Sequence, residues 1–513
     1  MKIQIRFSFA FLATIFILLP YAQSSLGTTG DINWWCNQTP NPKPCTYHMS
    51  RIPQSASTPI SRKQFLTMAA QTALDGVISE LAYIKSLEPR VLNNAERSAW
   101  SHCLLSYNLT ANFLRNILDV KTKSKASDVQ VRLSGASTNI FSCRDGFADV
   151  NETTNIYPLV ISNNVTELIT NCLAVNKVLF EEEKRFRPKE FRKSFPANNS
   201  VFDEPDCVVA QDGSGNFTTV TEALEASTDR EDVSQRYVIQ VRQGTYEEYP
   251  VVRAEMKNIV LVGEGMDNTI ITGSKSLPPL ADCSTFQVYG DGFIAKDITF
   301  ENTAGMDAGQ AVAVLSQADQ AVFYLCGFRG NQDTLYAETQ RQFFRECEIY
   351  GTVDFIFGNA NAVFQQSTIY PSNTDRGLVV TAQGRSGLNE STGTVIQNCR
   401  IVAAPDFTPE GSPAYLGRPW KDYSTVVIMQ SFLDSVVNPA GWMEWEGADP
   451  GRDSTVFYAE FDNSGPGSDT DERVQWPGYH NITDPDELEQ YSIDNFIDGS
   501  SWLPDTGVPF DLF

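Results

Sequence analysis

The chain has 513 residues, of which 42% are hydrophobic and 11% aromatic, which supports more than one packed core and excludes a disordered protein. Residues 1–200 hold 22 Lys and Arg against 15 Asp and Glu, whereas residues 201–513 hold 17 against 48. The strongly acidic second part argues against a nucleic-acid-binding protein, because such a surface repels a phosphate backbone.

The first 25 residues have the pattern of a secretory signal peptide. Lys2 and Arg6 introduce an apolar run over residues 7–19, and small residues follow at positions 22, 24 and 25. The run is short for a membrane-spanning helix, with a retained signal anchor as the alternative. We therefore expect a secreted, extracellular protein with no stable membrane association.

Sequons and cysteines fit the same secretory route. Eight Asn-x-Ser/Thr sequons, of which we expect only some to be glycosylated, stand at Asn37, Asn108, Asn151, Asn164, Asn198, Asn216, Asn389 and Asn481. In an oxidising compartment the ten cysteines should be partly paired. Cys36 and Cys45 enclose a short proline-rich loop and are candidates for a local disulfide.

Residues 30–180 have the periodicity of a helical bundle. Apolar residues recur at intervals of three and four in four segments, 65–77, 95–118, 127–147 and 161–180. Four antiparallel helices are the natural packing of such segments, and Cys103 and Cys143 on the second and third could be bridged. This part has no constellation of Asp, Glu and His that suggests catalysis, so we expect a packing or binding module.

A charged linker follows over residues 181–202, with basic pairs at 184–185 and 192–193. Basic pairs in an exposed secretory linker are either protease sites or part of a solvated spacer, and the sequence favours neither. The catalytic candidates all lie after this linker, in residues 203–513.

From residue 208 onward, short β-rich runs are separated by Gly, Asn and Asp, with no long helical pattern. An interval of 21 residues separates three pairs, Asp333 and Asp354, Cys326 and Cys347, and Phe343 and Phe364. A short fixed period with β-type residues is typical of a parallel β-helix, in which residues one period apart lie about 4.8 Å apart on neighbouring rungs. Each pair should therefore stack.

Asp333 and Asp354 are the strongest catalytic candidates. Two stacked carboxyl groups cannot both ionise freely, so one pKa should rise and leave an acid beside a carboxylate. The chain has only three histidines, all outside this region, which argues against a Ser-His-Asp hydrolase, and no His/Cys cluster has zinc spacing. We expect carboxylate chemistry without a metal or cofactor. The alternative is that both aspartates only shape turns of the coil.

Motifs in the second part make it resemble a plant pectin methylesterase, from residues 208–217 to about Trp502. They are Gly244–Glu248 (GTYEE), Gln310–Ala313 (QAVA), Gln332–Tyr336 (QDTLY), Asp354–Gly358 (DFIFG) and Leu416–Trp420 (LGRPW). The helical part, with its two cysteine pairs, resembles the pectin methylesterase inhibitor module. The resemblance implies an N-terminal all-α four-helix bundle followed by a C-terminal all-β right-handed parallel β-helix.

The resemblance also implies an activity and its residues. The reaction would be hydrolysis of galacturonate methyl esters in homogalacturonan, the backbone of pectin, with release of methanol and modification of the cell wall. By motif, Asp354 is the nucleophile and Asp333 the general acid and later base. Gln332, helped by Gln310, donates hydrogen bonds to the oxyanion, while Arg418 orients Asp354 and keeps it ionised.

Further expectations concern the groove and its partners. Trp420 should line the sugar groove, and Arg418 should lower the pKa of Asp354. Leu280 and Leu315 depart from the family pattern, which has a threonine and an arginine there, and both changes bear on groove specificity. The implied partners are pectin and either the chain's own inhibitor-like domain or a separate inhibitor protein. Cys326 and Cys347 are expected to form a structural disulfide behind the site.

Two other functions remain open from the sequence. Paired carboxylates on a solenoid also suit a glycoside hydrolase of the pectin backbone, which would create reducing ends without releasing methanol. A catalytically impaired pectin-binding or inhibitory protein is the non-enzymatic alternative. The complete set of Gln332, Asp333, Asp354 and Arg418 argues against it.

Overall fold

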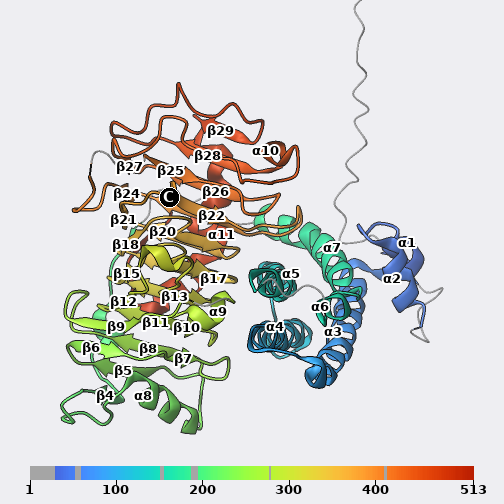
Figure 1. The fold of residues 1–513 in the computed structure, drawn as a ribbon. Helices are drawn as coiled ribbons and strands as arrows, with labels where there is room; N and C mark the ends of the chain where they lie inside the picture. Colours follow the sequence, from blue (N-terminus) through green and yellow to red (C-terminus); the bar gives the residue numbers. More distant parts are fainter. Residues whose placement is uncertain (1–28, 52–58, 151–154, 186–193, 277–278, 409–412) are drawn as a thin grey trace, which may run out of the picture.

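The computed structural model describes residues 29–51, 59–150, 155–185, 194–276, 279–408 and 413–513. A helical domain packs along one side of a β-helix (Figure 1). The predicted signal peptide, the sequon at Asn151 and the basic segment 186–193 lie outside the described residues. Among the helices of these ranges, none combines the length and apolarity needed to span a membrane.

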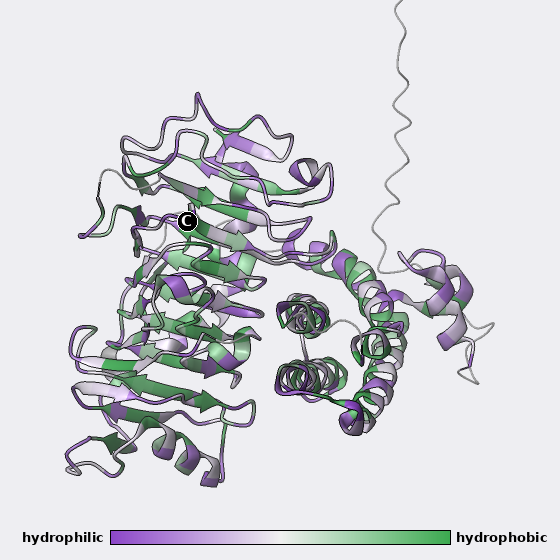
Figure 2. Ribbon diagram, in the orientation of Figure 1, coloured by the Kyte–Doolittle hydropathy of each residue, from purple (hydrophilic) through white to green (hydrophobic). Residues whose placement is uncertain are grey.

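The helical domain is built around the predicted bundle. Its long helices are α3 (Arg62–Ser86), α4 (Asn94–Leu118), α5 (Ala126–Asp149) and α7 (Val165–Arg185), and its short ones α1 (Ile32–Cys36), α2 (Pro42–Met49) and α6 (Tyr157–Val160). The chain enters α3 through a capping box, in which Ser61 accepts from the backbone of Gln64 and Gln64 accepts from the backbone of Ser61. Hydrophobic and hydrophilic residues alternate along these helices, as a bundle with one buried stripe requires (Figure 2).

Two disulfides join elements of the helical domain. Cys36–Cys45 links α1 to α2, and Cys103–Cys143 links α4 to α5. Both predicted bridges of this domain are therefore confirmed. The second one ties together the two helices that face the β-helix.

Within the described residues, the β-helix consists of three parallel sheets. The seven-stranded sheet contains β7 (Val251–Val252), β10 (Phe286–Val288), β13 (Val314–Ser316), β16 (Leu335–Ala337), β19 (Ile356–Gly358), β22 (Leu378–Gln383) and β25 (Ala414–Gly417). The eleven-stranded sheet contains β4 (Cys207–Val209), β5 (Tyr237–Val241), β8 (Ile259–Val262), β11 (Ile294–Lys296), β14 (Ala321–Tyr324), β17 (Arg341–Arg345), β20 (Asn361–Gln365), β23 (Gly393–Gln397), β26 (Thr425–Met429), β28 (Phe457–Phe461) and β29 (Tyr479–Ile482). The eight-stranded sheet contains β6 (Gly244–Glu247), β9 (Thr269–Gly273), β12 (Thr299–Asn302), β15 (Gly327–Arg329), β18 (Glu348–Gly351), β21 (Thr368–Pro371), β24 (Arg400–Ile401) and β27 (Phe432–Leu433).

Stacked phenylalanines fill the interior of the coil, but one predicted stacking pair does not form. Phe323 stacks on Phe344, and Phe344 stacks on Phe364 with ring centroids 4.4 Å apart. Phe343 instead pairs with Val363, so the predicted stack of Phe343 on Phe364 is wrong. The reason is that three residues connect β16 to β17 and only two connect β19 to β20, which shortens this interval to 20 residues.

The end of the chain packs against the outside of the eleven-stranded sheet. The short strand β3 (Ser194–Phe195) pairs antiparallel with β30 (Phe510–Asp511), and helix α11 (Ile493–Ile497) lies in the same apolar cluster. Phe202 also belongs to this cluster, so the chain is already part of the β-helix before residue 203. The predicted domain boundaries remain predictions. Helix α7 continues through Arg185, so it extends beyond residue 180, where the helical domain was predicted to end.

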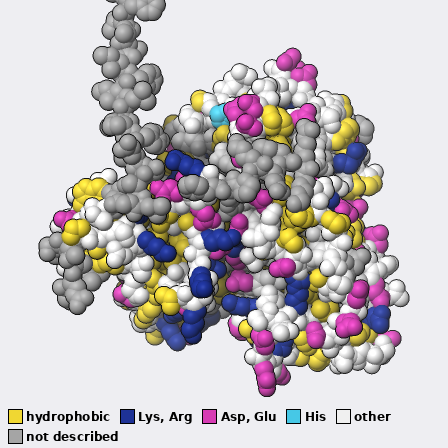
Figure 3. Space-filling model, turned by 180° about the vertical axis from the view of Figure 1, so that it is seen from behind, with side chains coloured by type: hydrophobic (Ala, Val, Ile, Leu, Met, Phe, Trp, Pro, Cys, Tyr) yellow, Lys and Arg dark blue, Asp and Glu magenta, His cyan; other side chains and the backbone are white. Residues whose placement is uncertain are grey.

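Charge is distributed unevenly over the two domains. Seen from behind, Lys and Arg side chains gather mainly on the side of the helical domain, while Asp and Glu side chains are scattered over the β-helix (Figure 3). The ion pairs between the two domains nevertheless run in both directions, with the positive charge in the helical domain in one pair and in the β-helix in the other. Lys125 of α5's start contacts Asp498, whereas Asp145 of α5 contacts Lys421.

Candidate active site

The two candidate aspartates occupy equivalent positions on neighbouring rungs. Strand β16 pairs in parallel with β19, with Leu335 opposite Ile356, and each aspartate stands two residues before these positions. Both lie in the left-handed backbone region, with φ of 63° at Asp333 and 52° at Asp354. The backbone N–H of Asp333 donates to the carbonyl oxygen of Val353. The stacking predicted from the 21-residue interval is confirmed.

Arg418 follows β25 and binds only one of the two aspartates. Its Nε donates to Oδ1 of Asp354 at 2.8 Å, and its Nη2 donates to Oδ2 at 2.6 Å. The guanidinium also lies 4.4 Å from the centre of the Trp445 ring, and this contact restricts its orientation further. A planar fork with an aromatic ring over one face and two N–H groups on the carboxylate fixes Asp354 in one orientation.

One amide side chain contacts the other aspartate, and a second glutamine precedes it in the chain. Nε2 of Gln310 donates to Oδ2 of Asp333 at 2.8 Å. Gln310 and Gln332 form a parallel bridge, and Gln332 directly precedes Asp333. The structure thus brings Gln310, Gln332, both aspartates and Arg418 into one site, as the motifs predicted.

Burial raises the pKa of both carboxyl groups, which are 4% and 5% exposed. The pKa of Asp333 lies well above the usual range of a carboxyl, first because the group is buried and second because Asp354 is charged. The pKa of Asp354 is also raised, because burial outweighs the hydrogen bonds and the charge of Arg418. The predicted rise at Asp333 is confirmed, but the predicted lowering at Asp354 is wrong for this arrangement.

Aromatic rings continue the site along the outer face of the seven-stranded sheet. Tyr336 and Phe357 stack with ring centroids 4.2 Å apart and planes 11° apart. The ring of Trp420 stands edge-on to both, at 6.4 Å and 6.1 Å. These flat apolar surfaces next to the carboxyl groups suit a sugar ring.

The C-terminal half of α5 lies against this site. Oγ of Ser142 donates to Oε1 of Glu338 at 2.5 Å, and Lys421 Nζ lies 2.9 Å from Oδ2 of Asp145. Asp149, at the end of α5, is close enough to Asp333 to raise its pKa further by repulsion. The helical domain therefore covers the carboxyl pair in this structure.

Hydroxyl groups earlier in α5 anchor the same surface. Oγ of Ser137 donates to Oε1 of Glu390 at 2.9 Å, and Nδ2 of Asn359 donates to Oγ1 of Thr138 at 2.8 Å. Motif reasoning missed these residues. The sequence did contain a signal. Small hydroxyl residues form one stripe of α5, whereas a buried helix face is usually apolar, so this stripe indicates a polar contact surface.

An apolar contact completes the cover. Leu109 of α4 is buried in one cluster with Leu280, Leu315, Tyr336 and Phe357 of the β-helix. Leu105 and Trp420 pack against the same cluster. Docking thus combines buried hydroxyl–carboxyl contacts from α5 with leucines from α4.

The predicted disulfide between Cys326 and Cys347 is not present. Both thiols are free and buried, although the two residues lie on adjacent rungs. Each Sγ donates instead to a backbone carbonyl, Cys326 to that of Tyr324 and Cys347 to those of Phe323 and Arg345. Because these hydrogen bonds satisfy the thiols, the stack needs no covalent link.

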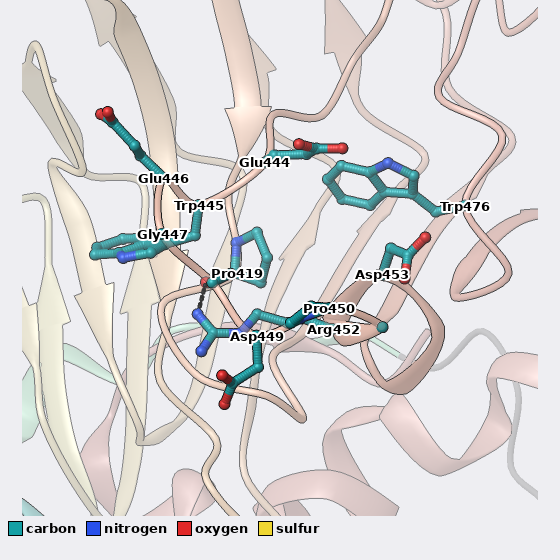
Figure 4. A pocket seen from close by; sticks show the side chains of 12 residues that line it. Pro419, Glu444, Trp445, Glu446, Gly447, Asp449, Pro450, Arg452, Asp453 and Trp476 are labelled. Atoms are coloured by element: carbon teal, nitrogen blue, oxygen red, sulfur yellow. Dashed lines mark hydrogen bonds between the residues drawn. The ribbon is translucent and has the colours of Figure 1, made fainter.

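A pocket is formed next to this site by Pro419, by residues 444–453 and by Trp476 (Figure 4). It adjoins Arg418 through Trp445, whose ring contacts the guanidinium. The rings of Trp445 and Trp476 and the carboxylates of Glu444, Glu446, Asp449 and Asp453 line it. Arg452 lies on its floor and donates to the carbonyl oxygens of Pro419 and Trp420. Arg452 therefore fixes the backbone of the segment that presents Arg418.

Among the described residues, no three His, Cys, Asp or Glu side chains are grouped in a way that could hold a metal ion. The charged groups that shift the pKa of Asp333 are instead Asp354, Asp149 of α5 and Arg418. What this arrangement can supply chemically is a fixed carboxylate, an adjacent protonated carboxyl, and amide donors.

Comparison with known proteins covers both parts of the chain. A family model described as pectinesterase matches residues 206–500, and one described as plant invertase/pectin methylesterase inhibitor matches residues 30–175. Pectinesterase 2 of Citrus sinensis is 42% identical over 96% of this chain and 97% of its own length. Probable pectinesterase/pectinesterase inhibitor 17 of Arabidopsis thaliana is 42% identical over 94% of both. The solved structure of a pectin methylesterase from carrot, with 45% identity and a TM-score of 0.58, matches 60% of this chain with 98% of its own.

Proposed function

Since this chain belongs to the pectinesterase family and carries an N-terminal domain of the inhibitor family, we propose that it de-esterifies homogalacturonan in the cell wall with Asp354 as nucleophile. The matching family model, the relatives and the solved structure support pectin methylesterase activity for this chain. The proposal adds the substrate, the place of action and the residue that performs each step.

In the first half of the reaction, a carboxylate oxygen of Asp354 attacks the carbonyl carbon of the methyl ester. The side-chain amides of Gln310 and Gln332 donate to the oxyanion that forms, a contribution of about 3 kcal/mol for one such donor. When the tetrahedral intermediate collapses, the methoxide takes the proton of Asp333 and leaves as methanol. A mixed anhydride between Asp354 and the galacturonate carbonyl remains.

In the second half, Asp333 is a carboxylate and acts as a general base. It takes a proton from a water molecule while the water oxygen attacks the galacturonate carbonyl carbon. Collapse of this second intermediate releases the galacturonate and restores the carboxylate of Asp354. Asp333 again holds the proton, so the site is ready for another turnover.

The observation that carries this assignment is the asymmetry around the pair. Asp354 receives two hydrogen bonds from the positive fork of Arg418, whereas Asp333 receives one from the neutral amide of Gln310. Of the two groups, Asp333 has the pKa that burial and its neighbour raise further. Asp354 is therefore the better carboxylate and Asp333 the better proton donor.

We further propose that the helical domain is the groove's occupant in the intact chain. Supporting this are the contacts of Ser142 with Glu338 and of Asp145 with Lys421, and the burial of Leu109 against the groove face. A polysaccharide needs the same surface, so it and the helical domain exclude each other. A separate inhibitor protein would compete for the same surface.

Substitution of Leu109 tests this occupancy in the full chain. Leu109→Asp places a charge in the apolar cluster and should raise methanol release from pectin by at least about tenfold, because a buried unpaired charge destabilises docking. The matched control is Leu92→Asp, since Leu92 precedes the same helix but is 78% exposed. Equal activity of the wild-type, Leu92→Asp and Leu109→Asp chains would refute occlusion.

The Leu109→Asp chain is also the background in which to test the catalytic pair. Asp354→Asn should reduce methanol release by at least about 1000-fold without unfolding the protein, because it removes the nucleophile. Asp462→Gln is the control, since Asp462 is an exposed aspartate with a similar left-handed backbone, φ 48°, and glutamine there creates no new sequon. Substantial residual activity in Asp354→Asn would refute the assignment, and new reducing ends instead of methanol would indicate a glycoside hydrolase.

Secretion into the cell wall is supported by the basic and apolar pattern of residues 2–19 and by the two disulfides. Expression in plant cells followed by mass spectrometry of the extracellular protein should find an N-terminus near residue 26. Retention of the first residues in a membrane fraction would favour the signal anchor instead.

A further inference from the structure

The outer face of the seven-stranded sheet presents one column of side chains across the rungs. Leu315 pairs with Tyr336, Tyr336 with Phe357, and Phe357 with Ala382. Their neighbours along the strands, such as Val314 and Leu335, belong to the interior core, so the members of this column point outward. Leu315 lies one rung before the carboxyl pair, and Gln287 precedes it in the same column.

Three side chains form what we call the Leu315 seat: Leu280, Tyr289 and Leu315. All three are buried in the cluster that Leu109 of the helical domain enters. Leu315 has no exposed surface while the helical domain is docked. The group that occupies the seat in this structure is therefore an uncharged aliphatic side chain.

The polar groups at the rim of the seat are already paired. The hydroxyl of Tyr289 donates to Oε1 of Gln287 at 2.8 Å, and Nε2 of Gln287 donates to the carbonyl oxygen of Ala281 at 2.8 Å. The carboxyl groups of Glu338 and Asp282 both lie close enough to Tyr289 to act on its pKa. The pKa of Asp282 is itself raised, because burial outweighs the charge of Lys275. Lys275 itself lies over the ring of Tyr249, 3.8 Å from its centre.

We propose that the Leu315 seat is a specificity subsite that takes a methyl-esterified galacturonate residue next to the one being hydrolysed. The inference rests on the proposed function, because it assumes that the open groove binds homogalacturonan beside Asp333 and Asp354. The seat would make the enzyme select runs of the polymer that are still esterified.

Rung spacing and desolvation support this selection. Neighbouring rungs are about 4.8 Å apart, a distance comparable to the length of one sugar residue. A polymer lying along the column would therefore place neighbouring residues on adjacent rungs. An ester methyl on the seat buries apolar surface against Leu280 and Leu315. A free carboxylate there would lose water and meet the paired amide of Gln287 and the acids Glu338 and Asp282, with no cation among the residues of the seat.

The test compares two substrates in the open, full-length Leu109→Asp chain. The ratio of kcat/KM for highly esterified pectin to kcat/KM for sparsely esterified pectin is independent of the fraction of open molecules, because both substrates report on the same population. Leu315→Arg should lower this ratio by about tenfold, since it replaces an apolar contact with a partner for a carboxylate. Leu315→Met, which keeps size and polarity, should leave the ratio unchanged.

Leu280→Gln provides a second variant and should lower the ratio in the same direction, even if Leu315→Arg does not fold. The exposed Val233→Arg on a remote loop controls for the added charge, since Val233 is 40% exposed. An unchanged ratio in folded Leu315→Arg or Leu280→Gln, or an equal loss on both substrates, would overturn the proposal. Absence of methanol release from every pectin in the Leu109→Asp chain would instead overturn the proposed function itself.

Discussion

Arg418 grips Asp354 through two hydrogen bonds of 2.8 Å and 2.6 Å and makes no such contact with Asp333, one rung away. Two aspartates that are equivalent by register are thereby given different chemistry. The difference does not come from the repeat of these two rungs, which treats the aspartates alike, but from Arg418 at the end of another strand of the β-helix, 64 residues beyond Asp354.

Replacement of Arg418 by Lys should therefore reduce the catalytic rate more than it reduces the stability of the fold. Lysine keeps the charge but loses the planar fork, so Asp354 is no longer held in one orientation, and kcat should fall by about 100-fold. Arg418 acts to lower the pKa of Asp354, so the acid limb of the pH–kcat/KM profile should move to higher pH. Arg329→Lys is a matched control, because Arg329 forms an exposed pair with Asp267. An unshifted acid limb would contradict this role of Arg418.

The docked state should weaken as the pH rises. The pKa of Asp149 is raised to about 6, by burial and then by repulsion from Asp145, while the charge of Lys421 opposes the shift. The pKa of Asp333 is raised as well. Both groups hold their protons more tightly when docked than when exposed, so docking is favoured at low pH and loses stability from about pH 4 through pH 6.

The ratio of methanol release by the wild-type chain to that by the Leu109→Asp chain measures this effect. The ratio should rise between pH 4 and pH 7, because only the wild-type chain has a docked state to lose. The Asp149→Asn variant should show a shallower rise, since it removes one of the two carboxyl groups. A pH-independent ratio would mean that these carboxyl groups do not change their exposure on opening.

The ion pair between Asp145 and Lys421 offers a separate test of the interface. Lys421→Asp should increase the activity of the full chain several-fold, because it places a negative charge against Asp145 at a partly buried position. The double variant Asp145→Lys, Lys421→Asp restores opposite charges and should return activity toward the wild-type level. Additive effects of the two substitutions would show that the pair does not couple the domains.

Thiol content distinguishes the two views of the stacked cysteines. With two disulfides among ten cysteines, the denatured, unreduced protein should titrate six thiols. A Cys326–Cys347 bridge would leave four. Cys347→Ser should change the melting temperature little, because Ser367 occupies the next stacked position and its hydroxyl donates to a carbonyl in the same way.

Several features of the fold could be predicted from local pattern alone. The helical segments follow from the three- and four-residue spacing of apolar side chains, and the rungs from short β-rich runs at a fixed interval. The 21-residue interval holds between Asp333 and Asp354 because they lie two residues before paired positions of β16 and β19. It fails at Phe343 because one later turn is a residue shorter, and the pattern of β-type residues does not encode that deletion.

The sequence by itself determined the two domains, the disulfides of the helical domain and the set of residues that meet at the site. Motifs identify Gln310, Gln332 and Arg418 because their chemistry depends on residue type. Tertiary structure decided the direction of the pKa shift at Asp354, the free state of Cys326 and Cys347, and the cover over the groove. Each of these depends on burial and on partners distant in sequence, which are properties of the packed interface between α4, α5 and the β-helix.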